Sequence, residues 1–376
     1  MAHDANLYPA DRVVRAQRAA AEAGLDVLLV SPGPDLRYLT GYEALPLERL
    51  TCLVAPAEGD PFLVVPLLEV PAAEASPVAG LGIEIVGWRE TDDPYALVAS
   101  RLGRSLGRVG LDNHMWAEKV LAFRDALPGA EQALAGTVLG ELRARKSPAE
   151  VAALLEAAEA IDRVHSRVQD FLRPGRTEAE VGKDIADAIV EEGHVRADFV
   201  IVASGPNGAS PHAEVSDRVI RAGEPVVVDI GGTMPSGYCS DSTRNYVAGD
   251  VQPPQEYLDL YDVLLAAQKA QCDAVAPGIT AEELDAVGRD LIAAAGYGEY
   301  FVHRTGHGIG LETHEEPYIV SGSARKLEPG HAFSIEPGIY LPGRFGARIE
   351  DIVVCTETGG ERLNLTSRDL RVLPAS

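Results

Sequence analysis

A short sequence pattern occurs twice in the C-terminal part of this chain. Residues 173–180 read Arg-Pro-Gly-Arg-Thr-Glu-Ala-Glu, and residues 276–283 read Ala-Pro-Gly-Ile-Thr-Ala-Glu-Glu. The alignment continues through three further matched pairs: Asp187 with Asp290, Ile189 with Ile292, and Gly193 with Gly296. Each copy predicts a long helix, a Pro-Gly turn, a second capped helix and then strands. The duplication therefore favours two α/β halves related by pseudo-symmetry, with helices packed outside a curved sheet.

The N-terminal part has a different pattern. Residues 8–24 predict an amphipathic helix that stops at Gly24. Short apolar runs then alternate with turns and helical patches, which predicts an α/β domain with a mixed sheet; the runs are residues 27–30, 52–54, 62–65, 83–86 and 109–111. Ser147, Pro148 and Glu150 form a capping-box start for a new helical unit. We therefore expect an N-terminal domain over residues 1–135 and a second domain over residues 136–376.

Bulk properties narrow the class of protein. The chain has 376 residues, enough for two domains with sizeable cores. Its formal net charge of −24 argues against nucleic acid or an anionic membrane as a partner, because phosphate binding needs a basic surface. No stretch is apolar for the roughly 20 residues that a membrane span needs, and residues 1–6 have no basic segment leading into an apolar one. The four cysteines are far apart, which suits reduced thiols and a cytoplasmic location.

Five potential metal ligands lie in strand-like or turn-like sequence: Asp229, Asp241, His307, Glu336 and Glu350. Asp229 ends an apolar run and Asp241 follows a Gly-Tyr turn, so the two acids are expected on facing arms of one hairpin. Four buried carboxylates without cations would each cost several kcal/mol in desolvation and mutual repulsion. Two divalent ions would balance their charge, so the pattern predicts a two-cation site rich in oxygen ligands.

These residues occur in phrases that resemble the metal-site motifs of the pita-bread metallopeptidases, in the branch of prolidase and aminopeptidase P. The phrases are Asp229-Ile-Gly-Gly, Gly237-Tyr-Cys-Ser-Asp241-Ser-Thr-Arg244, His303-Arg-Thr-Gly-His307-Gly-Ile-Gly-Leu-Glu-Thr-His314, Ser334-Ile-Glu336-Pro-Gly-Ile-Tyr340 and Arg348-Ile-Glu350-Asp351. The resemblance covers residues from about 146 to the end strongly and the first 135 more loosely. It implies a creatinase-like N-terminal α/β domain, followed by a pita-bread domain with pseudo-symmetric halves around a curved antiparallel sheet.

The resemblance also implies roles for the five ligands. Asp229 chelates one metal, His307 and Glu336 hold the other, and Asp241 with Glu350 bridge both. A pair of such ions activates water and polarises the scissile carbonyl, and Glu336 takes the proton from the attacking water. Carboxylate-rich coordination favours Mn²⁺, with Co²⁺ and Zn²⁺ as possible substitutes.

Three further histidines and one arginine belong to the predicted site. By resemblance, His212 contacts the substrate, while His303 and His314 line the proline subsite or stabilise the tetrahedral intermediate. Arg348 is two residues before Glu350 and shares its face of a strand, where a guanidinium can hold a carboxylate in place or bind a substrate carboxylate.

The resemblance favours a cytoplasmic Xaa-Pro dipeptidase that acts on short proline-containing peptides, with homodimerisation implied in the same way. Xaa-Pro aminopeptidase, which cleaves the same bond in longer peptides, is the nearest alternative. Creatine amidinohydrolase uses this fold without metal, and a metal-free binding protein is a third class. Both are disfavoured because all five ligands are kept. The sequence has no His-Glu-x-x-His helix, and a water activated by the two ions is the expected nucleophile.

Overall fold

The computed structural model describes residues 7–375. The chain forms two compact units, residues 1–143 and residues 144–376. The domain boundary that the sequence predicts, between residues 135 and 136, stays a prediction. Residues 1–6, on which the expectation of no targeting segment rests, lie outside the described residues. In the described part of the chain, we find no helix with the length and hydropathy needed to cross a bilayer.

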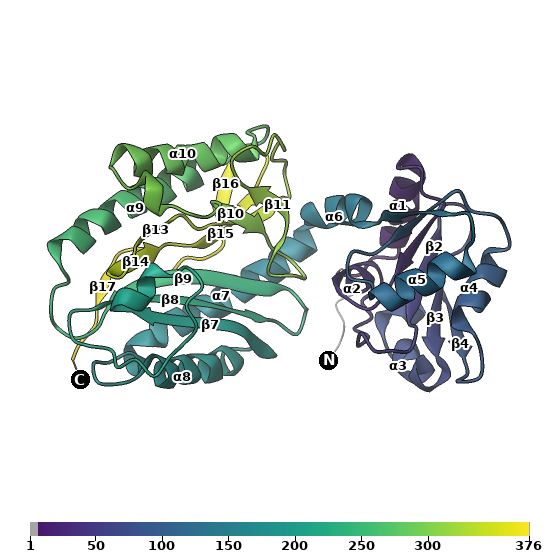
Figure 1. The fold of residues 1–376 in the computed structure, drawn as a ribbon, viewed down its shortest axis with the longest axis horizontal. Helices are drawn as coiled ribbons and strands as arrows, with labels where there is room; N and C mark the ends of the chain where they lie inside the picture. The colour runs from purple at the N-terminus through teal and green to yellow at the C-terminus, as the bar shows by residue number, and fades with distance from the viewer. Residues whose placement is uncertain (1–6, 376) are drawn as a thin grey trace. The chain divides into compact units, whose positions relative to one another are not determined.

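The first unit is built on a six-stranded mixed sheet in the order β4-β3-β2-β1-β5-β6 (Figure 1). β1 pairs antiparallel with β2 and parallel with β5. Its strands are β1 Val27–Val30, β2 Cys52–Pro56, β3 Phe62–Pro66, β4 Glu84–Trp88, β5 Arg108–Leu111 and β6 Glu131–Leu134. Its helices are α1 Asp11–Glu22, α2 Pro34–Thr40, α3 Val70–Glu74, α4 Pro94–Leu102, α5 Ala117–Ala126 and α6 Gly136–Ala144, which ends at the boundary.

Helices cover both faces of this sheet. Leu29 of β1 packs with Val98 of α4 and Phe123 of α5, while α1 lies against β1 and β2. All four residues of β1 are therefore buried, as expected for a strand covered on both sides. The predicted α/β domain with a mixed sheet is confirmed. β6 was missed because its residues are polar, half-exposed or exposed and carry no apolar run.

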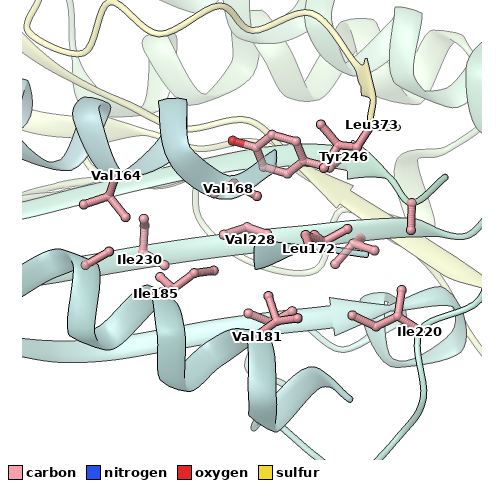
Figure 2. Packing of buried hydrophobic residues seen from close by; sticks show 14 of the residues in the cluster. Val164, Val168, Leu172, Val181, Ile185, Ile220, Val228, Ile230, Tyr246 and Leu373 are labelled. Atoms are coloured by element: carbon pink, nitrogen blue, oxygen red, sulfur yellow. The ribbon is translucent and has the colours of Figure 1, made fainter. Parts of the chain in front are cut away.

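The second unit begins with a helix pair packed on an antiparallel hairpin sheet. The elements are α7 Pro148–Phe171, α8 Glu178–Glu191, β7 Arg196–Ser204, β8 Pro225–Thr233 and β9 Cys239–Val247. α7 starts at the predicted capping box, in which the Ser147 hydroxyl accepts from the Glu150 N–H. Figure 2 shows how Val164 and Val168 of α7 and Ile185 of α8 meet Val228 and Ile230 of β8. This core fixes the sheet on which the predicted ligands lie.

A second helix pair and further strands complete this unit. α9 Gln255–Ala274 and α10 Ala281–Ala294 pack against each other. The strands are β10 Gly306–Gly308, β11 Glu315–Ile319, β12 Ala332–Ile335, β13 Gly338–Leu341, β14 Phe345–Arg348, β15 Asp351–Cys355, β16 Gly360–Arg362 and β17 Arg371–Val372. They form the sheets β11-β10-β12-β15-β16 and β13-β14, while β17 joins β9, β8 and β7. All pairings in this unit are antiparallel except that of β17 with β9.

The predicted pseudo-symmetry is present in the backbone hydrogen bonds. Thr177 and Thr280 cap α8 and α10 with the same capping box, and each forms an isolated antiparallel bridge, to Val219 and to Lys326 respectively. The Pro-Gly turns make matching hydrogen bonds as well. The Gly175 N–H donates to the Ile220 carbonyl, and the Gly278 N–H donates to the Leu327 carbonyl. The repeated sequence therefore builds the same helix-turn-helix unit twice.

Candidate metal centre and its pocket

The first two acids lie on the β8–β9 hairpin, as predicted. β8 and β9 pair in register, with Asp229 opposite Thr243 and Gly231 opposite Asp241. Positions 229 and 231 share one face of β8, so Asp229 and Asp241 are diagonal neighbours on that face. Both side chains are buried. The alternation of side chains along the two strands is thus enough to place both carboxylates on the same face of the hairpin.

The second half of the unit supplies the other three predicted ligands. His307 is the central residue of β10, Glu336 directly follows β12, and Glu350 directly precedes β15. His307 Nε2 lies 3.0 Å from Glu336 Oε1 and 3.7 Å from Asp241 Oδ2. Candidate ligand atoms of Asp241, His307 and Glu350 all lie within 4.8 Å of one another. Residues far apart in the sequence therefore converge on one buried cluster.

The hydrogen bonds of His307 bear on whether the cluster suits a cation. Its Nδ1 lies 3.1 Å from the carbonyl oxygen of Gly308, which can only accept, so Nδ1 carries a proton. Nε2, the atom that faces Glu336 and Asp241, is then the position for either a second proton or a bound metal ion. Lone pairs facing carboxylates repel unless a proton or a metal ion lies between them. The donor set therefore fits a divalent cation.

Titration of the buried acids agrees with this. Burial, followed by the charge of Glu350, raises the pKa of Asp241 well above its usual value. Burial and the charge of Glu336 do the same to the pKa of Glu350. Burial also opposes ionisation of Glu336, but hydrogen bonding and charge from His307 win and lower its pKa to about 2. Without a cation, protons must neutralise part of this cluster.

Arg348 is the buried cation nearest to the acids and holds Asp229. Its Nη2 donates to Asp229 Oδ2 at 2.5 Å, Nη1 donates to Tyr340 and to the Pro211 carbonyl, and Nε donates to Thr243. Asp229 Oδ1 is buried and has no hydrogen-bond partner. One carboxylate oxygen is thus fixed by a guanidinium while the other is left for a metal ion. Of the two functions predicted for Arg348, the contacts fit the positioning of a carboxylate.

All nine predicted site residues line one cavity of about 900 Å³. His307 and His314 stack edge to face, with ring centroids 4.0 Å apart. His212 and His314 are exposed at the wall, whereas His303 is partly buried. Partial enclosure by the cavity, then the neighbouring His307 and Arg304, lower the pKa of His314 to about 4. The His314 ring is therefore neutral at neutral pH.

A hydrogen-bonded chain that the sequence did not reveal joins His303 to Asp229. His303 Nδ1 donates to the Arg304 carbonyl, so its Nε2 accepts from the Tyr340 hydroxyl at 2.9 Å. The Tyr340 oxygen accepts in turn from Arg348. Tyr340 belongs to one of the motif phrases quoted above, but the sequence assigned it no role. Its place beside Ile339 in an apolar strand predicts a strand residue and does not identify its hydrogen-bond partners.

The cavity also has walls that sequence reasoning did not assign. Phe199 and Ile201 of β7 form an apolar side, and Asp198 and Arg304 line the cavity as well. β7 is half-exposed in its central part, and its sequence shows no motif. Only the pairing of β7 with β8, which sets Ile201 opposite Asp229, brings these residues to the site.

Such a fold, with a carboxylate-rich centre between two pseudo-symmetric halves, defines the class of pita-bread metallopeptidases. Residues 152–357 match metallopeptidase family M24, and residues 12–145 match the creatinase/prolidase N-terminal domain. The chain belongs to this family and is a metallo-exopeptidase. The predicted family and fold are thereby confirmed.

Relatives of similar length support the assignment over the whole chain. A probable dipeptidase PepE of Mycobacterium tuberculosis is 52% identical over 373 residues, which are 99% of this chain and 98% of that protein. The Xaa-Pro dipeptidase of Lactobacillus delbrueckii subsp. lactis is 38% identical over 364 residues, which are 94% of this chain and 96% of that protein. The crystal structure of dipeptidase PepE from Mycobacterium ulcerans superposes with a TM-score of 0.93 at 53% identity, covering 99% of both chains. The prolidase from Thermococcus sibiricus gives a TM-score of 0.89 at 38% identity, covering 96% of this chain and 98% of that one.

Proposed function

We propose that this chain is an Xaa-Pro dipeptidase that hydrolyses the X-Pro bond of short peptides with two divalent metal ions. The observation that carries the proposal is the convergence of Asp241, His307 and Glu350 within 4.8 Å at the base of a cavity that all nine predicted residues line. Relatives named dipeptidase and Xaa-Pro dipeptidase supply the substrate class. The cavity belongs to the predicted catalytic domain, residues 136–376.

The five predicted ligands divide the work of holding the metals. Asp229 would bind through its unpaired Oδ1, while Arg348 holds its other oxygen. His307 would bind the other ion through Nε2 together with Glu336, and Asp241 and Glu350 would bridge. The ions supply an activated water and polarise the peptide carbonyl when bound. Mn²⁺ is the proposed metal because the ligands are mainly carboxylates, with Co²⁺ or Zn²⁺ as substitutes.

One of the ligands and the other side chains of the cavity handle the peptide. Glu336 would take the proton from the attacking water, because its carboxylate lines the cavity in which the peptide bond is attacked. Neutral His314 can donate a hydrogen bond to oxygen, and His212 and His303 line the same space. The apolar side formed by Phe199 and Ile201 suits a proline ring. An X-Pro amide lacks the N–H that ordinary peptidases grip, so a wall of this kind replaces backbone recognition.

A two-substrate assay tests the function. Protein stripped with a chelator and reloaded with Mn²⁺ should hydrolyse Ala-Pro faster than Ala-Pro-Ala, and it should leave Ala-Ala almost untouched. Faster cleavage of Ala-Pro-Ala would support the alternative, an Xaa-Pro aminopeptidase.

Asp241→Ala and Glu350→Ala should abolish turnover and metal retention together, with metal retention measured by elemental analysis. Full activity in either variant would refute the bridging assignment. A cytoplasmic location and a homodimer complete the proposal and are tested by fractionation and light scattering.

A further inference from the structure

Two arginines line the catalytic cavity, and they are in different situations. Arg348 is buried, and its N–H groups donate hydrogen bonds to Asp229, Tyr340, Thr243 and the Pro211 carbonyl. Arg304 is partly buried, and no carboxylate among residues 7–375 pairs with it. The other charged side chains of the cavity wall are acids. Arg304 is therefore the basic group of the cavity that remains able to receive an anion.

The Arg304 guanidinium is held in place without its charge being used. It lies over the Tyr318 ring at 4.4 Å from the centroid. Stacking of this kind fixes the plane of a guanidinium while its N–H groups stay available at the edge. A planar fork with free donors matches the geometry of a carboxylate. A preorganised arginine loses less side-chain entropy when it binds such a group.

Arg304 also lies on the side of the cavity where the chemistry occurs. It is three residues before His307, and its backbone carbonyl accepts from His303. Arg304, His307 and His314 line the same cavity, and the His314 ring stacks on the His307 ring. The carboxylate of an X-Pro dipeptide is one residue beyond the scissile bond, or about 3.6 Å along the chain. In a longer peptide this position is a neutral amide.

We propose that Arg304 binds the free C-terminal carboxylate of the substrate and thereby makes the enzyme a dipeptidase. This inference rests on the proposed function and deepens it, because it names the group that would separate dipeptides from longer peptides. Tyr318 acts as a positioning residue for Arg304. Arg348 is excluded from this role because Asp229 occupies it.

The kinetic test compares Ala-Pro with Ala-Pro amide, which differ only in the terminal charge. The parent protein with Mn²⁺ should prefer Ala-Pro in kcat/KM by about ten- to hundredfold, the range of one charge-assisted hydrogen-bonded pair. Arg304→Met should lose most of that factor on Ala-Pro and keep its rate on Ala-Pro amide. Arg304→Lys should fall between them, because it keeps the charge and loses the fork. Equal losses on both substrates, or no loss on either, would overturn the inference.

A matched control and a binding measurement separate the two proposals. Arg344 also stacks on an aromatic ring, that of Phe345, but it pairs with Glu256 and does not line the cavity. Arg344→Met should leave the substrate preference unchanged. Calorimetry with L-proline and L-prolinamide measures the same contact without turnover, and only Arg304→Met should lose the preference for L-proline. A parent protein that cleaves no X-Pro bond would refute the proposed function. In that case, equal L-proline affinities of parent and Arg304→Met would also overturn the carboxylate subsite.

Discussion

Asp241 illustrates how the ionisation of a residue at the centre affects the stability of the folded protein. Its carboxyl is buried beside Glu350 and Asp229, and these surroundings raise its pKa well above 3.8. In metal-free protein, the titration of Asp241 is thus shifted towards the protonated form. Since the folded-state pKa is raised, its stabilising contribution is complete below about pH 4 and is lost as the pH rises through the raised value.

Asp241→Asn removes this titration. At pH 8 without metal, we expect the variant to be more stable than the parent by about 1.4 kcal/mol for each pKa unit of the shift. The difference should vanish near pH 4. Urea unfolding at several pH values, with chelator present, measures it.

Adding Mn²⁺ should stabilise the parent protein more than the variant. At a free concentration one hundred times Kd, the parent should gain about 2.7 kcal/mol, whereas the variant gains little. Equal stabilisation of both proteins by Mn²⁺ would show that Asp241 is not a ligand.

His314 should separate turnover from metal binding. Its neutral ring stacks on His307 but contributes no predicted ligand atom. We expect His314→Ala to lower kcat by about 10²- to 10⁴-fold, the usual contribution of a positioned proton donor. Elemental analysis should still find both metals. Unchanged kinetics would remove His314 from the mechanism.

At the residue scale, the sequence singled out the five candidate ligands more readily than the side chains that contact them. The ligands stand in short ordered phrases, so residues such as His307 and Glu350 could be recognised individually. Tyr340, Thr243 and Arg304 act through partners that are distant in sequence. Arg348 reaches Asp229 only because β14 and β8 are brought together by the fold, and no local pattern contains that information.

At the scale of elements, one histidine links α7 to the hairpin that carries two of the acids. His165 of α7 is fully buried; its Nδ1 lies 3.0 Å from the Tyr246 hydroxyl, and its Nε2 lies 3.2 Å from the Ser242 carbonyl. Burial, then the charge of Arg244, lowers its pKa from 6.5 to about 3. The packing of α7 on β9 therefore depends on a neutral imidazole.

This contact predicts acid sensitivity. Because the folded-state pKa is depressed, the contribution is complete above pH 6.5 and is lost as the pH falls toward 3. Between pH 7 and pH 4.5, we expect a loss of about 2 to 3 kcal/mol from this group. His165→Gln should flatten that part of the curve of unfolding free energy against pH. His114→Gln, at an exposed position in the first unit, is the control. A parallel curve for His165→Gln would contradict the assignment.

Element prediction succeeded where local signals were strong. Capping boxes at Ser147, Thr177 and Thr280 marked helix starts that the structure reproduces. The short strands around residues 306–319 were recognised only as motif, since β10 has three residues and two of them are glycines. The single curved sheet that the resemblance implied is divided into separately hydrogen-bonded sheets. Sequence periodicity carries no information about where such a ladder is interrupted.

At the scale of the whole molecule, the nine predicted site residues all belong to residues 144–376. Metal binding should therefore stabilise this unit specifically. We expect Mn²⁺ to slow amide hydrogen exchange in peptides from β8, β9, β10, β12 and β15, and to leave peptides from residues 7–143 unchanged. Mass spectrometry measures both sets in one experiment. Chelator-treated Asp241→Asn is the control, and equal slowing in both units would contradict a centre confined to one of them.

The tight packing of β10 has a consequence for engineering. A Cβ on Gly306 would overlap the Ser334 carbonyl oxygen, and one on Gly308 would overlap that of Glu316. The two glycines therefore fix the backbone of this strand between β11 and β12, independently of the side chain at 307. Libraries randomised at that single position would present thiolate, carboxylate or imidazole from an unmoved scaffold, which offers a direct route to variants with altered metal selectivity.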